Sequence, residues 1–336
     1  METGTIIVIA VVVLGLAFEF VNGFHDAANA IATVVATRVL TPLQATIMAG
    51  VLNLVGALAG TAVAATVAKG IVDSTKVTQD LVLAALLAAI VWDLITFYAA
   101  LPTSSSHALI FSMIGAAVSV HGWGVIIVPG LEKTSSAIVV SPTAALVVGY
   151  LLMLGLYWLL KDVSYTFVNR FFGKAQIASS AWMAFTHGGN DGQKTMGIIS
   201  LALFAGGFLG AEKAGFVPDW VKISCALAIG IGTMTGGYRI IKTMGMRITL
   251  LKPVNGFVAE TTAGGIIEIA TRLGIPISTT HAISGAIIGV GATRRLSAVR
   301  WGIAGRIVSA WVLTIPGCFI FGYAGAWIMR TAGLHL

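Results

Sequence analysis

The chain is divided into long apolar runs, each close to the length of a membrane-spanning helix. Residues 4–20, 43–68, 81–100, 137–160 and 303–327 are predominantly apolar, and a helix needs about 20 apolar residues to cross the bilayer core. Only 10% of the 336 residues are charged, whereas soluble proteins carry about 25%. We therefore predict an all-α, polytopic membrane protein. The basic residues lie mostly in short loops, which indicates membrane orientation and not a nucleic-acid partner.

Two motifs occur twice in the chain, in the same order. The segment 102–107, Pro-Thr-Ser-Ser-Ser-His, returns at 276–281 as Pro-Ile-Ser-Thr-Thr-His. The segment 23–29, Gly-Phe-His-Asp-Ala-Ala-Asn, aligns more loosely with 188–194, Gly-Gly-Asn-Asp-Gly-Gln-Lys. A chance match in a chain rich in Gly, Ala and Ser does not account for two pairs in one order. The sequence therefore predicts an internal duplication.

The charges of the loops predict how the chain crosses the membrane. Three segments hold ten basic residues and one acidic residue, namely 161–174, 239–252 and 294–300. Three others have balanced charge, namely 69–80, 121–137 and 211–222. The positive-inside rule places the first group in the cytoplasm, so both termini lie outside. The stretches 81–120 and 257–292 then begin and end on one side, which predicts two re-entrant helical hairpins.

This topology divides the chain into two inverted repeats. We expect residues 1–160 to form the first repeat, 161–174 a short cytoplasmic connector and 175–336 the second repeat. Each repeat has three full crossings and one hairpin, and the odd number of crossings inverts the second repeat relative to the first. This is the plan of secondary transporters, with the two hairpin tips meeting near the midplane. The predicted location is the inner (cytoplasmic) membrane.

Two aspartates lie in the middle of the long apolar stretches 4–38 and 175–210. An ionised group there costs about 2.5–3.5 kcal/mol, and glycines and asparagines surround both carboxylates. Because glycine permits unusual backbone angles, we predict a broken helix in each stretch, with oxygen atoms free to bind a hard cation. An ion pair between Asp191 and Lys194 is the alternative. The predicted cation-binding residues are Asp26, Asn29, Asn190 and Asp191.

Hydroxyl residues follow the prolines at both hairpin tips, in a pattern that is typical of a helix start. A helix N-terminus offers unpaired amides and partial positive charge. Two such ends converging from opposite faces suit a tetrahedral oxyanion. The alternative is that the hydroxyls only cap the helices or hold them together. The predicted substrate-binding residues are Ser104, Ser105, Ser106, Ser278, Thr279 and Thr280, with Gln193 from the second Asp motif.

His25 departs from the match between the two Asp motifs, since its repeat equivalent is Asn190. A titratable residue beside a carboxylate at one of two matched sites indicates proton coupling. A structural hydrogen bond is the alternative. His107 and His281 occupy equivalent places, where they either donate to the anion or pin the hairpins.

The four motifs together resemble those of the PiT family of inorganic phosphate transporters. The matching stretches are 23–30, 101–107, 187–194 and 275–281, and the likeness covers nearly the whole chain. The Gly-Phe-His-Asp form of the first motif is most similar to that of bacterial low-affinity phosphate permeases. The resemblance implies a symporter, not an enzyme, with Asp26 and Asp191 at the cation and the hydroxyl tips at phosphate.

The resemblance also implies how the transporter is driven. It implies co-transport of H⁺ or Na⁺, no bound cofactor, and a homodimer in the lipid bilayer. Bacterial members are similar in carrying a neutral metal–phosphate complex, in which case Asp26 and Asp191 are metal ligands. A sulfate or other oxyanion permease on the same scaffold is the alternative function. An intramembrane Ser/His hydrolase is disfavoured, because the Ser/His motif occurs twice.

Overall fold

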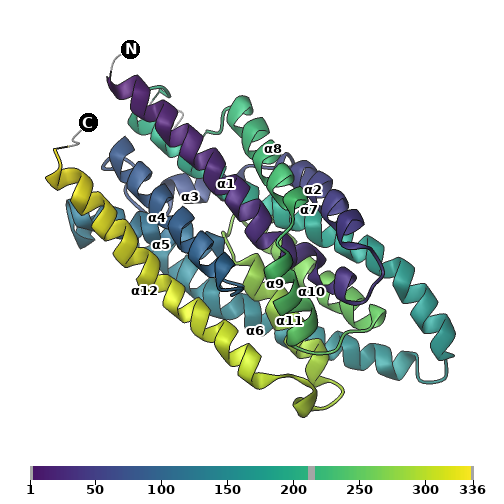
Figure 1. Ribbon diagram of the computed structural model, residues 1–336. Helices are drawn as coiled ribbons and strands as arrows, with labels where there is room; N and C mark the ends of the chain where they lie inside the picture. The colour runs from purple at the N-terminus through teal and green to yellow at the C-terminus, as the bar shows by residue number, and fades with distance from the viewer. Residues whose placement is uncertain (1–2, 211–215, 334–336) are drawn as a thin grey trace.

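Helices make up almost all of the chain in the computed structural model, which describes residues 3–210 and 216–333 (Figure 1). The α-helices are α1 (Thr3–Ala36), α2 (Pro42–Ala57), α3 (Ala62–Lys69), α4 (Gln79–Tyr98), α5 (Ser105–His121), α6 (Val128–Leu159), α7 (Tyr165–Ala205), α8 (Asp219–Thr235), α9 (Tyr238–Lys242), α10 (Pro253–Arg272), α11 (Thr279–Ala292) and α12 (Trp301–Thr331). Shorter turns are η1 (Trp123–Val125), the π-helical η3 (Thr243–Arg247) and η4 (Leu296–Ala298). The all-α prediction is confirmed.

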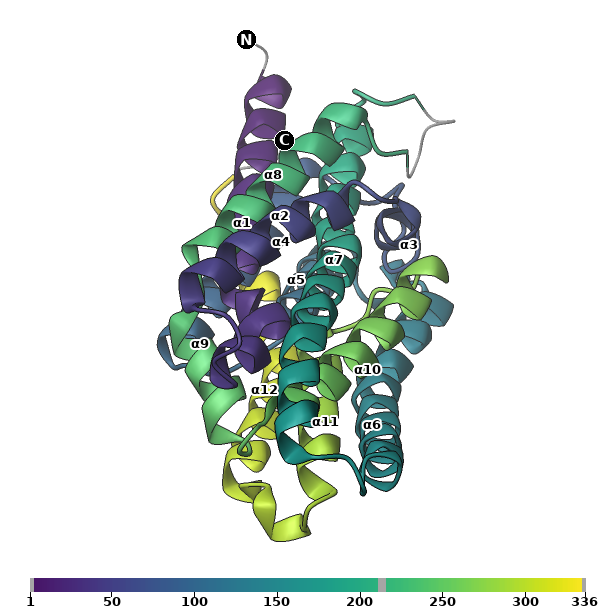
Figure 2. The same cartoon turned by 90° about the vertical axis from the view of Figure 1, so that its right-hand side faces the viewer.

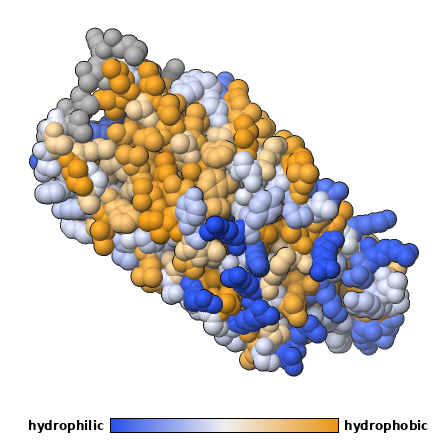
Figure 3. Space-filling model, viewed as in Figure 1, coloured by the Kyte–Doolittle hydropathy of each residue, from blue (hydrophilic) through white to orange (hydrophobic). Residues whose placement is uncertain are grey.

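The outer surface of the bundle is apolar. Among the described helices, α1, α4, α6 and α12 are long and apolar enough to cross a membrane, and α2 with α3 forms a fifth, bent candidate. Large side chains on α6 and α12 face outward, with Trp158 81% exposed and Val312 61% exposed. Figure 3 shows the apolar surface extending over most of one face. Such a surface is stable in lipid and not in water.

Hydrophilic residues gather at one end of the molecule. The start of α1 and the end of α12 lie at the opposite end, whereas the α6–α7 connection and the start of α12 lie at the hydrophilic end (Figures 1 and 2). These two connections carry the basic segments 161–174 and 294–300. The structure therefore places these two basic segments at the same end of the molecule, as the charge pattern predicts. In the balanced segment 211–222, Glu212 and Lys213 lie outside the described residues.

Both predicted hairpins consist of two helices joined by a short turn. α4 and α5 form the first hairpin, and α10 and α11 form the second. The two turns contain residues with positive φ at equivalent places, Ala100 at 54° and Gly274 at 63°. The Ala100 carbonyl accepts a hydrogen bond from Thr243 of η3 (3.1 Å). Gly274 packs against α3, where an added Cβ would lie 3.2 Å from the Ala62 carbonyl oxygen. Each tip thus rests on a short helix from the other half of the chain.

The prediction of broken helices at the two aspartates is wrong. α1 and α7 continue through Asp26 and Asp191 without interruption. The nearby glycines instead allow close packing between helices, because a Cβ on Gly23 would lie 2.5 Å from the Ile229 carbonyl oxygen. A Cβ on Gly188 would lie 2.1 Å from the Asn53 carbonyl oxygen. In the first half, the break occurs in the span that follows α1, since α2 and α3 meet at a bend of 69°.

The charge pattern predicts opposite labelling of two engineered cysteines. Lys76→Cys should react with a membrane-impermeant maleimide in intact cells, and Asp162→Cys should react only after permeabilisation. Both positions are exposed, and the native Cys225 and Cys318 are buried, so background labelling should be low. Labelling of Asp162→Cys in intact cells would contradict the predicted orientation.

The packing role of Gly188 predicts that alanine substitutions at two glycines of α7 have different effects on stability. Gly188→Ala should lower the free energy of unfolding by about 1–3 kcal/mol, because the methyl group overpacks the contact with α2. Gly173→Ala is the matched control, since a Cβ there has no neighbour within 4 Å and alanine favours the helix by about 0.5–1 kcal/mol. Thermal unfolding in detergent measures both. Equal behaviour of the two variants would reject the packing explanation.

Candidate ion and anion site

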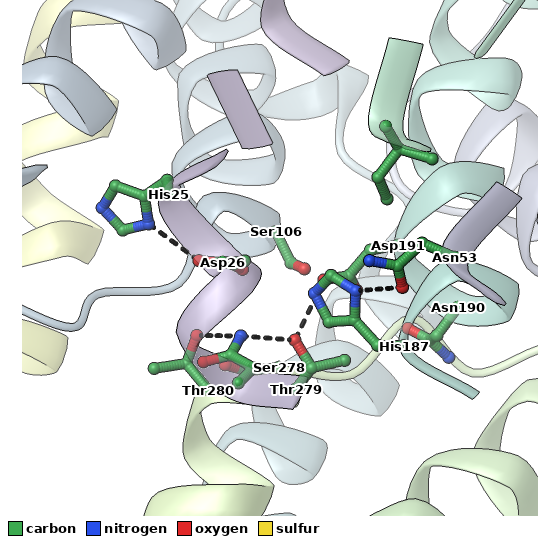
Figure 4. A network of polar contacts seen from close by, with 12 residues as sticks. His25, Asp26, Asn53, Ser106, His187, Asn190, Asp191, Ser278, Thr279 and Thr280 are labelled. Atoms are coloured by element: carbon green, nitrogen blue, oxygen red, sulfur yellow. Dashed lines mark hydrogen bonds and ion pairs between the residues drawn. The ribbon is translucent and has the colours of Figure 1, made fainter. Parts of the chain in front are cut away.

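Four elements meet at the centre of the bundle. α1 contributes Asp26, α7 contributes Asp191, and the two hairpin tips contribute the first residues of α5 and α11 (Figure 4). The rings of His107 and His281, one from each tip, lie 4.7 Å apart between centroids. The structure therefore brings the two matching Ser/Thr-His motifs face to face.

Three side chains of this centre form a possible cation site. Asp26, His187 and Asp191 each offer one ligand atom, and these atoms lie within 4.8 Å of one another. All three residues are at most 2% exposed. The structure thus unites the two predicted aspartates and adds His187. Sequence reasoning missed His187, although its place four residues before Asp191 puts both side chains on one helix face.

The hydrogen bonds of His187 leave its Nε2 facing the carboxylate of Asp191. Asn53 donates its amide hydrogen to Thr233 (2.8 Å), which turns its carbonyl oxygen toward His187 Nδ1 at 2.9 Å. His187 therefore donates from Nδ1, and its Nε2 lies 3.2 Å from Asp191 Oδ2. Either a proton or a metal ion must lie between these two atoms, since an imidazole lone pair and a carboxylate oxygen repel each other. A metal-bound histidine uses its second nitrogen in this way.

His25 lies on the other side of Asp26 from His187 (Figure 4). Its Nδ1 is 2.7 Å from Asp26 Oδ1, and its Nε2 is 3.1 Å from Thr96 Oγ1 of α4. The repeat equivalent, Asn190, donates to Thr271 Oγ1 (2.8 Å) of α10. His25 and Asn190 thus both tie a long helix to the hairpin of the same half. This arrangement favours the structural alternative for His25.

Five of the six predicted hydroxyl residues divide into two groups, and the hydroxyl of the sixth, Ser105, is buried outside both. Ser104 and Ser278 cap α5 and α11, because each accepts a hydrogen bond from the backbone N–H three residues later, at 3.2 Å. This is the capping alternative. Three others join the central network: Thr280 accepts from Asn29 (2.9 Å), Thr279 accepts from Asn29 and donates to Asp191 Oδ2 (2.9 Å), and Ser106 accepts from Lys194.

Two helix N-termini supply the positive groups of the site. The first N–H groups of a helix have no partner within the helix, and in α5 and α11 they belong to the buried residues Ser105, Ser106, Thr279 and Thr280. Together with the hydroxyls, they can donate to an oxyanion. His281 stacks on Trp311 at 3.9 Å between ring centroids, which favours a pinning role for this histidine.

Lys194 forms the ion pair with Asp191 that the sequence offered as an alternative. Its ammonium group also donates to Ser106 Oγ and to the Ile277 carbonyl oxygen (2.7 Å). Asp191 is therefore engaged on both oxygens. Oδ1 contacts Lys194, and Oδ2 contacts Thr279 and faces His187.

Gln193 lies away from this network. Its Oε1 accepts from the Val63 amide of α3 (2.8 Å), and its Nε2 donates to the Gly189 carbonyl oxygen (2.6 Å). It lines a cleft of about 370 Å³ that also includes Glu268 and Arg272. The structure does not bring Gln193 to the other predicted substrate residues.

Two more buried carboxylates accept hydrogen bonds beside α1, and the motifs gave no role for them. Glu260 of α10 accepts from Thr33, Ser179 and Gln176. Glu19 accepts from Thr195, one turn beyond Asp191. Both are 0% exposed. Their charge within apolar segments was the one signal that could have pointed to them.

Comparison with known proteins identifies the family of the chain. The chain is 48% identical to a "Probable low-affinity inorganic phosphate transporter" of Rhizobium meliloti over 92% of each chain. It is 45% identical to a protein of the same description from Bacillus subtilis, over 94% of this chain and 95% of that one. A solved structure, "The sodium-dependent phosphate transporter", superposes with a TM-score of 0.87 at 25% identity, covering 97% of this chain and 99% of that chain.

The family model described as "Phosphate transporter family" matches the chain twice, over residues 22–167 and 161–322. The relatives are transporters, so the prediction of a non-enzymatic protein is confirmed. The chain belongs to the phosphate transporter family.

Proposed function

We propose that this transporter is a symporter that imports inorganic phosphate together with a cation held by Asp26, His187 and Asp191. The observation that carries the proposal is the buried cluster of Asp26, His187 and Asp191, whose ligand atoms lie within 4.8 Å of one another. The names of the relatives support phosphate as the anion. The name of the structural neighbour supports a co-transported cation.

The chemistry of the site explains why the two ions travel together. A bare phosphate that leaves water loses far more hydration free energy than the two helix ends return. A helix end stabilises an adjacent charge by only about 0.3–2 kcal/mol. Lys194 pairs with one of the two buried carboxylates, so without a further cation the other carboxylate still repels the phosphate. A cation between the carboxylates and the anion removes both costs. Import then needs one half of the chain to rotate against the other and open the enclosed site to either face.

The ligand set favours a divalent metal as this cation. Imidazole binds transition metals well, and carboxylates suit Mg²⁺, Ca²⁺ and Mn²⁺, whereas Na⁺ is not expected to prefer a nitrogen ligand. We therefore propose that the cargo is a neutral metal–phosphate complex, with protons as the driving ion. Sodium coupling is the second candidate, because the structural neighbour is sodium-dependent by name.

We further propose an inner-membrane location with both termini outside, and a homodimer. The location follows from the basic loops and from the bacterial relatives. The dimer follows from the family resemblance alone. Native mass spectrometry in detergent at two concentrations tests it.

Removing divalent metal should remove transport. In proteoliposomes with an imposed pH gradient, chelation of Mg²⁺ and Mn²⁺ should abolish most radiolabelled phosphate uptake, because the buried carboxylate then repels phosphate without a compensating metal ion. Restored metal should restore uptake, and excess sulfate should not compete. Undiminished uptake without metal under a sodium gradient alone would reject the complex in favour of sodium coupling. Competition by sulfate would favour the alternative oxyanion.

The three ligands should also behave differently from a surface carboxylate. Asp26→Asn, Asp191→Asn and His187→Ala should each abolish phosphate uptake while the protein still inserts in the membrane. The exposed Glu132→Gln is the control and should transport like the wild type. His25→Asn separates the two roles of His25, since it should keep metal-dependent uptake if His25 only positions Asp26. Wild-type uptake in Asp26→Asn would overturn the site.

A further inference from the structure

We propose that Lys194 is a tethered cation that permanently fills the second of two cation positions. The inference rests on the proposed function, and it concerns how many exchangeable cations the transporter carries. The site of the second half would therefore bind no free monovalent cation, and the central position at Asp26, His187 and Asp191 would be the exchangeable one.

The surroundings of the Lys194 ammonium have the composition of a metal-ion site. Its three contacts are a carboxylate oxygen of Asp191, the hydroxyl of Ser106 and the backbone carbonyl of Ile277. Carboxylate, hydroxyl and carbonyl oxygens are the ligands that hard cations take in proteins. Lys194 is 2% exposed, so water does not supply the contacts.

All three ammonium hydrogens are used by these contacts. A lysine side chain has three N–H donors and no acceptor, and the three acceptors come from α7 and both hairpin tips. The group therefore has no hydrogen left to offer to phosphate. This separates a tethered cation from a phosphate-binding lysine, which must keep a donor free.

The duplication shows what the position holds in the other half. Aligning the two aspartates places Asn29 opposite Lys194, and aligning the tips places Thr280 opposite Ser106. Asn29 donates to Thr280, and Lys194 donates to Ser106. The same contact between a long helix and the tip of the opposite half thus occurs twice. It is made once by a neutral amide and once by a charged ammonium.

The charged partners of the two aspartates differ in the same way as these two contacts. In the first half, Asp26 has the histidine His25 and the central position as partners. In the second half, Asp191 is paired with the ammonium group of Lys194, which is covalently attached to the chain. A mobile cation is therefore needed in the central position beside Asp26 and not at the position of the Lys194 ammonium.

The test counts bound sodium ions in the purified, full-length protein. Lys194→Asn recreates the residue of the first half, and it should bind one more ²²Na⁺ per protomer than the wild type. Sodium should also raise its melting temperature, by on the order of 3 °C at saturating concentration, because a ligand that binds only the folded state stabilises it. Lys194→Met is the matched control, since it removes the same charge but offers no oxygen ligand and should bind no extra ion.

The wild type provides an independent measurement if Lys194→Asn does not fold. Thallium(I), a heavy stand-in for monovalent cations, should give no density in contact with Ser106 and Ile277 in a wild-type structure. Density there, with Lys194 displaced, would overturn the proposal. An unchanged ion count in folded Lys194→Asn would also overturn it and leave a purely structural ion pair. Phosphate and sulfate uptake by the same wild-type sample tests the proposed function separately, since the ion count does not depend on which anion is carried.

Discussion

Two like charges buried at short range govern the design of this transporter. The ligand atoms of Asp26 and Asp191 lie within 4.8 Å of each other inside an apolar bundle. At an effective dielectric constant near 20, two unit charges at that distance repel by about 3.5 kcal/mol. Positive groups must therefore surround the carboxylates. Lys194 and the N-terminal ends of α5 and α11 supply them, and the proposed mobile cation would add to them. Breaking a buried ion pair by removing one partner costs about 3–5 kcal/mol, and this cost makes the Asp191–Lys194 pair part of the fold as well as of the site.

Hydrogen bonds of the buried polar groups also hold the two halves of the chain together. Asn29 of the first half donates to Thr279 and Thr280 of the second, and Lys194 of the second half donates to Ser106 of the first. Hydrogen bonds between neutral groups contribute about 0.5–1.5 kcal/mol each, and those to charged groups about 1.5–3 kcal/mol. These values are similar to the energies of conformational change in proteins. The contacts are therefore strong enough to hold the two halves in the observed arrangement, and the proposed transport cycle would have to exchange them.

The sequence predicted the helical class, the two hairpins and most residues of the centre, because motif repetition and loop charge both follow from topology. It did not predict the continuity of α1 and α7. Glycines beside Asp26 and Asp191 are compatible with a helix break and with close helix packing, and only the position of Ile229 and Asn53 distinguishes these cases. His187 was missed because no repeat partner marked it. Gln193 was included because it stands in the motif, although its side chain turns to α3. In each case the missing information was which helix lies opposite a given face.

The contact of each hairpin tip with the other half bears on how tightly the protein seals the membrane. Ala100 is held by Thr243, and Gly274 rests on Ala62. The first hairpin is thus supported by the second half and the second hairpin by the first half. In the proposed transport cycle, a rotation of the halves would displace both supports at once, so that the two tips would not move outward independently. A continuous water path through the centre would dissipate an ion gradient, and this crossed support would oppose such a path while the proposed cargo passes.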